Sequence, residues 1–395
     1  MANLLDEASI LLTPTAYNNG SMLAVKPENG DGDFTFSRNS AATRVNAQGL
    51  VENVASNLPR IDYTDGCGSW LLEPQSTNLL TYSEQFDNAS WINNGVTINA
   101  NQVVSPGGSL TADLLTGVSG GFGVVRFSTW TATNKVASCF AKAGSTNLFK
   151  IANASFSNRY VIFDLNNGTV SEESTGWTGF IENYGNGWYR CIAISNNETG
   201  TFSLGVTAAS ESIYIWGAQL ESGYKTSYIP TSGAISTRLQ DIATNSGNAS
   251  LINSEEGVLY AEISALADDL TNKFISISNG SKAERVEIGY SNVSNKIFAF
   301  SSVGNVNQCN ISFVLSNMLD YNKIAISYAE NNFALWVNGV KVGVDLNASV
   351  SAENILNELA FDEGDGTDVF YSKTKALAVY KTALTDAQLT LLTTI

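Results

Sequence analysis

The sequence contains no histidine among its 395 residues. Histidine is the commonest general base, the usual activator of serine and cysteine nucleophiles, and the commonest transition-metal ligand in proteins. Its absence excludes the hydrolases and metal sites that depend on it. Chemistry that needs only carboxylates remains open, and this includes glycoside hydrolysis and calcium binding.

Cysteine is also scarce, and its four residues are scattered along the chain. Cys67, Cys139, Cys191 and Cys309 include no C-x-x-C pair, so the sequence argues against a zinc site or a redox motif. Cys139 and Cys191 fall in strand-like runs of one module and could meet. We expect them to be two buried free thiols rather than a disulfide.

Positive charge is in deficit, with 21 Lys and Arg against 37 Asp and Glu, and a net charge of −16. Such a field repels phosphate backbones, so we expect no nucleic-acid partner. No apolar run approaches the ~20 residues that span a bilayer, and we expect no membrane insertion. Residues 1–13 carry Asp6 and Glu7 but no basic segment, so we expect no signal peptide.

What the sequence does have is a long series of strand signals. Short apolar or alternating runs are separated by Gly, Asn, Asp and Ser clusters at intervals of roughly 8–12 residues, which is typical of β-sandwiches and barrels. The length suggests two domains. We therefore predict an all-β protein with two β-sandwich domains in series and an extended N-terminal arm that carries a hairpin.

Local signals mark the ends of several elements. Asn338-Gly339 lies between two apolar runs and favours a type I′ turn, whose positive φ angles suit a tight hairpin. Residues 214–223 are expected to form the last strand of the first sandwich. Helix is expected only over residues 385–392, with Thr385 as the N-cap and with Leu389 and Leu392 facing inward.

The chain divides into three expected segments. Residues 1–70 form the arm, residues 71–238 the first sandwich and residues 249–395 the second, with the polar residues 240–248 as a linker. A small hairpin is expected over residues 43–52. The arm has too few apolar residues for a core of its own, so it must pack on the first sandwich or on another protein.

Three stretches of the sequence resemble the head-spike, head-fiber and tail-associated proteins of bacteriophages. They are residues 35–52 (TFSRNSAATRVNAQGLVE), residues 72–87 (LEPQSTNLLTYSEQFD), and residues 186–190 (NGWYR) together with residues 216–231 (WGAQLESGYKTSYIPT). The resemblance implies a virion surface protein that carries a carbohydrate-binding-like jelly roll.

The second sandwich resembles concanavalin A-like, laminin-G-type domains. Residues 336–342, which contain the expected hairpin, and the ending over residues 379–389 carry this resemblance. The superfamily includes lectins, adhesion domains and glycosidases, so the fold that it implies does not decide the function.

Trp177 and Tyr184 are the candidate glycan-binding residues. Both stand in polar, Gly-flanked surroundings, where an exposed ring could stack on the apolar face of a sugar. A packing role is the alternative for each of them. Trp188 opens an apolar run and Trp216 lies in the expected last strand, so we expect both to pack inside the protein.

The acidic loop over residues 361–368 is the candidate metal site. Asp362, Asp365 and Asp368 alternate on a Gly-loosened loop, where their oxygens could converge on Ca²⁺. The spacing does not match an EF-hand, and a solvated acidic loop is the alternative. No other cofactor is expected.

Arg38 and Arg44 are the candidate anchoring residues of the arm. Their guanidinium groups could clamp carboxylates or backbone carbonyls of a neighbouring subunit. The alternative is that they pin the hairpin to its own first sandwich, and the sequence does not decide between these roles.

A carboxylate pair for glycoside hydrolysis is expected at alternate positions of a strand, because alternate residues share a face. No Glu-x-Asp-x-Glu run occurs, and the spacing of Glu284 and Glu287 places them on opposite faces of a strand. We therefore expect no enzymatic activity.

These features, with the resemblance, predict a bacteriophage virion structural protein such as a spike, fiber or surface adhesin. The arm would attach it to capsid or tail proteins, and the sandwiches would bind host-surface polysaccharide. The resemblance implies a homotrimer at the virion surface, assembled in the host cytoplasm. The alternatives are a capsid or tail decoration without glycan binding and a polysaccharide depolymerase.

Overall fold

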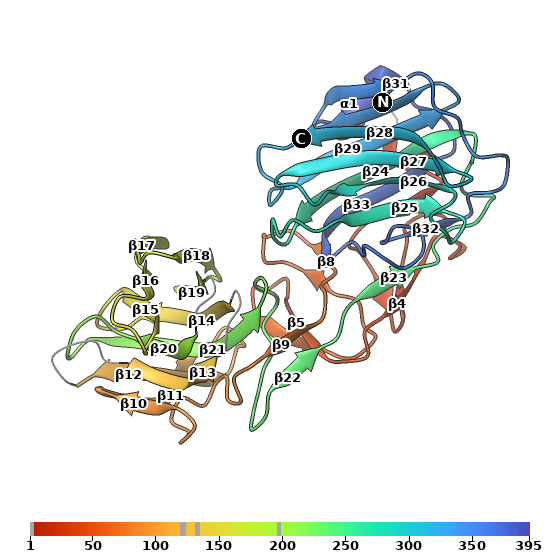
Figure 1. Ribbon diagram of the computed structural model, residues 1–395. Helices are drawn as coiled ribbons and strands as arrows, with labels where there is room; N and C mark the ends of the chain where they lie inside the picture. Colours follow the sequence, from red (N-terminus) through yellow and green to blue (C-terminus); the bar gives the residue numbers. More distant parts are fainter. Residues whose placement is uncertain (1–3, 119–123, 131–134, 196–198) are drawn as a thin grey trace. The chain divides into compact units, whose positions relative to one another are not determined.

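The computed structural model describes residues 4–118, 124–130, 135–195 and 199–395. Within these ranges the regular structure is nearly all β-strand, with a 3₁₀ helix η1 (Leu4–Glu7) and an α-helix α1 (Asp386–Thr393). The strands form stacked sheets, which Figure 1 shows as separate layers. The predicted fold class, all-β with two β-sandwiches, is confirmed.

The chain forms two compact units, and neither is continuous in sequence. Unit 1 contains Met1–Asn39, Val54–Pro74 and Gln240–Ile395, and unit 2 contains Ser40–Asn53 and Gln75–Leu239. The segment expected as a separate arm, residues 1–70, therefore divides between the units. Residues 240–248, expected as a linker, belong to unit 1.

Unit 1 is a sandwich of two sheets that combine hairpins of consecutive strands with pairings between strands that are distant in sequence. In order across the larger sheet, its described strands are β31 (Val340–Asp345), β30 (Phe333–Val337), β29 (Asn322–Ala329), β24 (Glu256–Ala265), β33 (Ser372–Tyr380), β8 (Ser69–Leu71) and β7 (Ile61–Asp62), and β1 (Ile10–Leu12) also pairs with β33. The smaller sheet runs β28 (Val306–Val314), β27 (Lys296–Val303), β26 (Arg285–Tyr290), β25 (Lys273–Ser278) and β32 (Glu358–Ala360).

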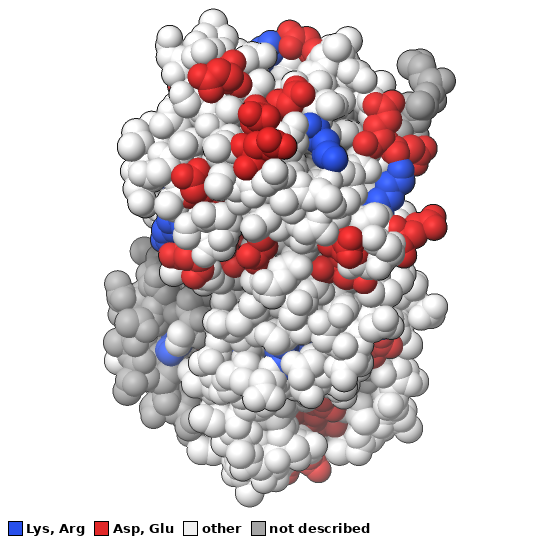
Figure 2. All heavy atoms as spheres, turned by 90° about the vertical axis from the view of Figure 1, so that its right-hand side faces the viewer, with Lys and Arg blue, Asp and Glu red and all other residues white. Residues whose placement is uncertain are grey.

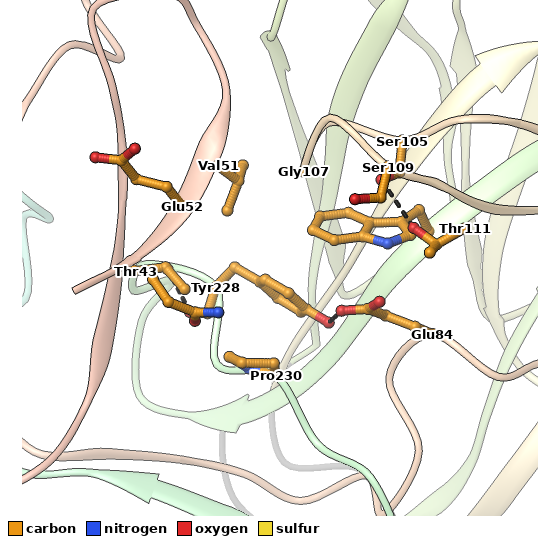
Figure 3. Close-up of a pocket in the computed structure, with 12 residues that line it drawn as sticks. Thr43, Val51, Glu52, Glu84, Ser105, Gly107, Ser109, Thr111, Tyr228 and Pro230 are labelled. Atoms are coloured by element: carbon orange, nitrogen blue, oxygen red, sulfur yellow. Dashed lines mark hydrogen bonds between the residues drawn. The ribbon is translucent and has the colours of Figure 1, made fainter. Parts of the chain in front are cut away.

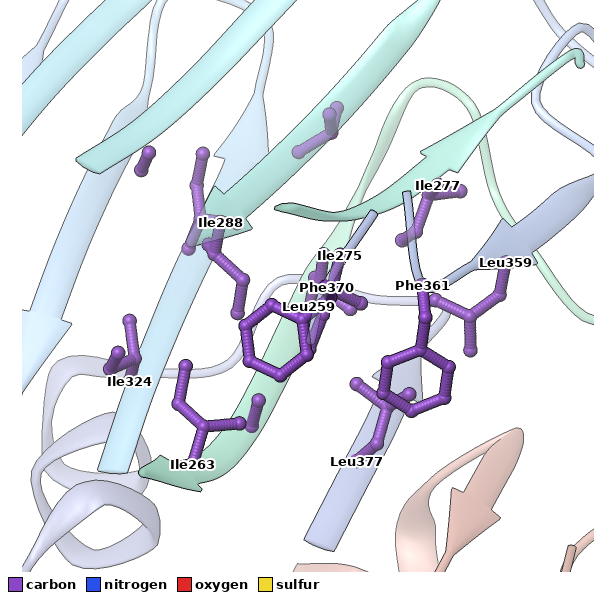
Figure 4. Close-up of a cluster of buried hydrophobic side chains, with 14 of the residues drawn as sticks. Leu259, Ile263, Ile275, Ile277, Ile288, Ile324, Leu359, Phe361, Phe370 and Leu377 are labelled. Atoms are coloured by element: carbon purple, nitrogen blue, oxygen red, sulfur yellow. The ribbon is translucent and has the colours of Figure 1, made fainter. Parts of the chain in front are cut away.

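The core of unit 1 lies between these two sheets. Figure 4 shows apolar side chains from both sheets meeting there, among them Ile275 and Ile288 from the smaller sheet and Leu259 and Leu377 from the larger one. Successive residues of β24 face opposite sides, because side chains alternate along a strand. Leu259 thus enters the sandwich core, whereas Tyr260 joins a second cluster on the outer face of the larger sheet.

Helix α1 covers part of that outer face. Thr385 is its N-cap and forms a capping box with Gln388, and Leu389 and Leu392 are buried, as predicted. The predicted hairpin turn at Asn338-Gly339 is also confirmed, because both residues have positive φ angles, 48° and 84°, between β30 and β31.

The N-terminal segments of unit 1 are integrated into its sheets. The three residues of β1 are buried and pair with β33, which ties the start of the chain to the last strand. A small sheet in unit 1 runs β2 (Tyr17–Asn18), β3 (Ser21–Met22), β4 (Phe34–Ser37) and β23 (Ile242–Thr244). The residues that the sequence suggested as an arm are fixed because Phe34 and Phe36 enter the core of unit 1.

A buried ion network joins three segments of unit 1. The Arg38 Nη1 atom lies 3.0 Å from Asp241 Oδ1, and Arg60 pairs with both Asp241 and Glu73, with 2.6 Å between Arg60 Nη1 and Glu73 Oε2. All four side chains are at most 2% exposed. The network lies close in sequence to points where the chain leaves and enters unit 1.

Unit 2 is a second sandwich with a core of its own. One sheet runs β10 (Ile92–Asn94), β13 (Val124–Trp130), β20 (Gly200–Gly205), β15 (Leu148–Asn153), β16 (Tyr160–Asp164) and β17 (Thr169–Glu173). The other runs β11 (Val96–Val104), β12 (Leu110–Gly117), β21 (Ser212–Ser222), β14 (Lys135–Ala143), β19 (Trp188–Ser195) and β18 (Trp177–Asn183). Two strand pairs accompany them: β5 (Ala42–Val45) with β6 (Val51–Val54), and β9 (Ser76–Asn78) with β22 (Ser236–Arg238).

Cys139 and Cys191 lie opposite each other on β14 and β19, and both are buried free thiols. The expectation from the sequence is confirmed, because the two residues meet without forming a disulfide. Burial raises the pKa of both thiols, so they stay protonated at neutral pH.

The surface reflects the excess of acidic residues. On the face shown in Figure 2, Asp and Glu side chains are more prominent than Lys and Arg, and broad areas carry no charge. In the part of the chain that the structure describes, no helix combines the length and apolar character needed to cross a bilayer.

Candidate functional site

A pocket of about 170 Å³ opens on unit 2. Figure 3 shows that side chains from several separate segments converge on it. Its lining residues are Thr43, Val51, Glu52, Asn53, Glu84, Ser105, Gly107, Ser109, Thr111, Trp216, Tyr228 and Pro230. The lining thus combines two aromatic rings, several hydroxyl groups and two carboxylates.

Two aromatic rings form the apolar part of the pocket. Trp216 comes from β21 and Tyr228 from the segment that follows this strand, and their ring centroids lie 4.8 Å apart at 50°. Both rings pack on Phe140 of β14. The pairing of β14 and β21 contains a β-bulge at Gly217. Glycine is favoured there because its φ is 62° and because a Cβ atom would lie 2.9 Å from the Phe140 ring.

The β5–β6 hairpin forms one side of the pocket. The Thr43 hydroxyl donates a hydrogen bond to the Tyr228 carbonyl, and the Val51 amide donates to the Pro106 carbonyl at 2.9 Å. Val51 also packs in a cluster with Trp188 and Trp216 on the outer face of the β21 sheet. The hairpin therefore packs on the first sandwich, which was one of the two partners expected for it.

Glu84 presents a carboxylate inside this pocket. The Tyr228 hydroxyl lies 2.9 Å from Glu84 Oε1 and 2.7 Å from the Ser83 hydroxyl. Burial raises the pKa of Glu84, and the hydrogen bond from Tyr228 opposes that rise. Among the ion pairs of the described residues, none joins Glu84 to a Lys or Arg side chain.

Glu52 is the second carboxylate of the lining, and its surroundings differ. The Arg44 Nε atom lies 2.7 Å from Glu52 Oε1, and the Asn46 side-chain amide donates to Oε2 at 2.9 Å. Burial would raise the pKa of Glu52, but the hydrogen bonds from Asn46 and Arg44 outweigh it and lower the pKa. The Glu52 carboxylate is thus charged at neutral pH, and Arg44 compensates its charge.

The candidate glycan-binding residues lie outside this pocket. Trp177 is buried at 4% exposure in the core of unit 2, so neither ring face is open to a sugar. It starts β18 and points between the two sheets, which corrects the expectation of a surface role. Tyr184 is half-buried and packs edge-on against Phe140, with centroids 4.8 Å apart.

The acidic loop is held by cations of unit 1. Glu363 pairs with Lys282 and with Arg285, the latter at 3.0 Å, and Lys282 Nζ lies 3.7 Å from Asp365 Oδ2. Asp362 is buried and accepts a hydrogen bond from the Gly364 amide. Over the described ranges no three His, Cys, Asp or Glu side chains are grouped as metal ligands, and Asp362, Asp365 and Asp368 do not form such a group.

Arg38 and Arg44 both have partners within the chain. Arg38 is buried in the ion network with Asp241, and its Nη2 also donates to the Ala55 carbonyl at 2.8 Å. Arg44 pairs with Glu52 within the β5–β6 hairpin. Arg38 thus joins segments of unit 1 and Arg44 ties together its own hairpin, so neither contact is the expected pin between the hairpin and the first sandwich. An anchoring role on a neighbouring subunit stays a prediction.

Sequence reasoning missed the residues that form the pocket. Trp216 was expected to pack inside the protein. It is buried as expected, but it also lines the pocket. Glu84 and Tyr228 lie in stretches that carry the resemblance, and no spacing rule marks them as neighbours. They meet because β21 and the segment after it return to the chain near residue 84.

Comparisons with known proteins give the chain no family. No family model matches the chain, and no curated protein matches it. Among solved structures, the CBM40 of the Ruminococcus gnavus IT-sialidase bound to alpha2,3 sialyllactose is similar at 15% identity, with a TM-score of 0.32, over 37% of this chain and 86% of that one.

Two further solved structures show the same kind of likeness. Domain 4 of AbnA, a GH43 extracellular arabinanase from Geobacillus stearothermophilus in complex with arabinotriose, is 13% identical over 44% of this chain and 82% of that one, with a TM-score of 0.32. Domains LG4-5 of the mouse laminin alpha1 chain are 9% identical over 68% of this chain and 90% of that one, with a TM-score of 0.25.

Proposed function

We propose that this protein is a bacteriophage virion surface protein that binds host-surface polysaccharide through the unit 2 pocket. The pocket is the observation that carries the proposal. Each of three stretches that resemble phage spike and fiber proteins supplies lining residues to it: residues 35–52 supply Glu52, residues 72–87 supply Glu84, and residues 216–231 supply Trp216 and Tyr228.

The chemistry of the lining supports a sugar as the ligand. A sugar offers many hydroxyl groups that need hydrogen-bond partners. The pocket offers the hydroxyls of Ser105, Ser109 and Thr111, and Trp216 and Tyr228, each 4% exposed, supply an apolar part of its wall. It is smaller than the roughly 300–1,000 Å³ of pockets for drug-sized ligands, so it suits one residue of a polysaccharide.

The remaining parts of the proposal rest on the resemblance. They are a place on the virion surface, attachment to capsid or tail proteins through N-terminal segments, and a homotrimeric assembly. Several copies on one particle would convert weak single sites into strong attachment, because the later binding events become intramolecular. The competing interpretation within the virion is a capsid or tail decoration that binds no glycan.

The test measures binding of labelled protein to intact candidate host cells, before and after periodate oxidation of their surface sugars. Binding that periodate abolishes supports the proposal. Ser109→Leu fills the pocket from an exposed lining residue, and Ser171→Leu makes the same change at an exposed site on β17. We expect only Ser109→Leu to weaken binding. Periodate-resistant binding, or no binding to a susceptible host, would favour the decoration.

Glycoside hydrolysis is a second candidate function, favoured by one observation. Glu52 and Glu84 line the same pocket, and their surroundings move their pKa values in opposite directions, as in an acid and base pair. Against it, both Glu52 oxygens are engaged by Arg44 and Asn46. Reducing ends released from host polysaccharide by the wild-type protein, but not by Glu84→Gln, would establish hydrolysis over binding.

A further inference from the structure

Among the residues that the structure describes, no Lys or Arg side chain forms an ion pair with the Glu84 carboxylate. Neither Lys nor Arg occurs among the residues that line the pocket. Asp87 and Asp113 add negative potential nearby: burial raises the pKa of Asp113 to about 6, and the charges of Asp87 and Glu84 contribute to that rise. A buried carboxylate favours an opposite charge, so this part of the pocket attracts a cation.

The surroundings of Glu84 suit an organic cation. Trp216 and Tyr228 lie beside the carboxylate and are each 4% exposed, so they wall the pocket with apolar atoms, and a charge pair formed there is stronger than in water. The hydroxyl oxygens of Ser105, Ser109 and Thr111 can accept the remaining hydrogen bonds of an ammonium, which has three donors. A bare metal ion fits less well, since no three acidic side chains of the described chain are grouped as ligands.

From this geometry we infer that the pocket takes an amine-bearing sugar, whose protonated amino group lies against Glu84. The inference rests on the proposed function, because it names the class of sugar that the same pocket selects. Uronic and sialic acids would be disfavoured, since their carboxylates would approach Glu84 and Glu52. Neutral sugars would bind less tightly, since they leave Glu84 without an ionic partner.

The test compares two probes that differ only at nitrogen: a glucosamine tetramer with free amines and the same tetramer N-acetylated. Calorimetry is done at about pH 6, where more of the weakly basic sugar amines carry a proton than at neutral pH, and at about 150 mM salt. We expect the free amine to bind the wild-type protein at least about tenfold more tightly, because a charge pair in a partly buried site exceeds its value in water.

Matched variants show whether that preference belongs to the pocket. Glu84→Gln should reduce it to about twofold or less, whereas Glu172→Gln, which removes the same charge at an exposed site on β17, should leave it unchanged. Ser109→Lys places a cation at the pocket and should also abolish it, whereas Ser171→Lys should not. The Ser109 pair keeps the test decisive if Glu84→Gln fails to fold.

The possible outcomes separate this inference from the proposed function. Equal affinity for the two tetramers, or tighter binding of the acetylated one, overturns the inference and leaves glycan binding standing. The inference is also overturned if Glu84→Gln and Ser109→Lys both keep the preference for the free amine. The same holds if Glu172→Gln and Ser171→Lys remove that preference as well. In either case the net charge of −16, and not the pocket, would explain the preference. If neither tetramer binds and cell binding is also absent, the proposed function falls with it.

Discussion

Replacing Asp241 by Asn should destabilise unit 1 strongly. Asp241 accepts hydrogen bonds from Arg38 at 3.0 Å, from Arg60, and from the Glu73 amide at 2.8 Å, and its side chain is fully buried. The Asn side chain has nearly the same size but no charge. Glu73, which pairs with Arg60, would then be the remaining carboxylate of a network that holds two buried guanidinium groups.

The expected magnitude follows from that burial. Removing one partner of a buried ion pair costs about 3–5 kcal/mol, because the other charge is left without compensation. Typical domains have about 5–15 kcal/mol in total, so the variant should lose a large share of the stability of unit 1. For a unit of this size the midpoint of thermal unfolding should fall by about 6–20 °C.

Asp386→Asn is the matched control. Asp386 pairs with Lys341 at 2.8 Å in the same unit, but its side chain is 72% exposed, so we expect a loss of at most about 1 kcal/mol. Scanning calorimetry and urea unfolding would compare the two variants. The reasoning fails if Asp241→Asn costs no more than Asp386→Asn, because burial would then not determine the strength of the network.

Three further predictions concern single sites. In the native protein a thiol reagent should label Cys67, which is exposed. It should reach the three buried thiols, Cys139, Cys191 and Cys309, only when the protein unfolds. Rapid labelling of all four thiols in the native protein would contradict this prediction. Burial raises the pKa of Glu287 from 4.5 to about 8. The folded state therefore holds this proton more tightly than the unfolded state, and the free energy of unfolding should fall as the pH rises from 4.5 to about 8. Urea titrations over this pH range should show a smaller fall for Glu287→Gln than for the wild-type protein. An equal fall in both proteins would contradict the role of Glu287. Calcium should leave the thermal midpoint unchanged, because Lys282 and Arg285 already compensate the acidic loop; a calcium-dependent rise that Asp365→Asn removes would instead establish a metal site.

Short-range features were predictable from the sequence. The Asn338-Gly339 turn and the Thr385 cap depend on a few neighbouring residues, and the structure has both as expected. The strand-rich pattern likewise predicted the all-β class, since side-chain alternation and turn residues are properties of short segments.

Features that depend on the surroundings of a side chain were not predictable. Trp177 looked like a surface residue because glycines and polar residues flank it, yet it starts β18 with its ring inside unit 2. The sequence left the role of Arg38 open, and its partner Asp241 is 203 residues away. In both cases a local pattern does not specify which distant segment covers a residue.

By itself, then, the sequence determined the strand class, the turns, the helix cap and the acidic character of this protein. Only the tertiary structure decided that residues 1–70 divide between two units, and that Glu52, Glu84, Trp216 and Tyr228 line one pocket. The physical reason is the range of the interactions. Turns and caps form between residues a few positions apart. The pocket instead needs backbone pairing between segments more than a hundred residues apart, such as β12 with β21 and Tyr82 with Ser232, to bring its groups together.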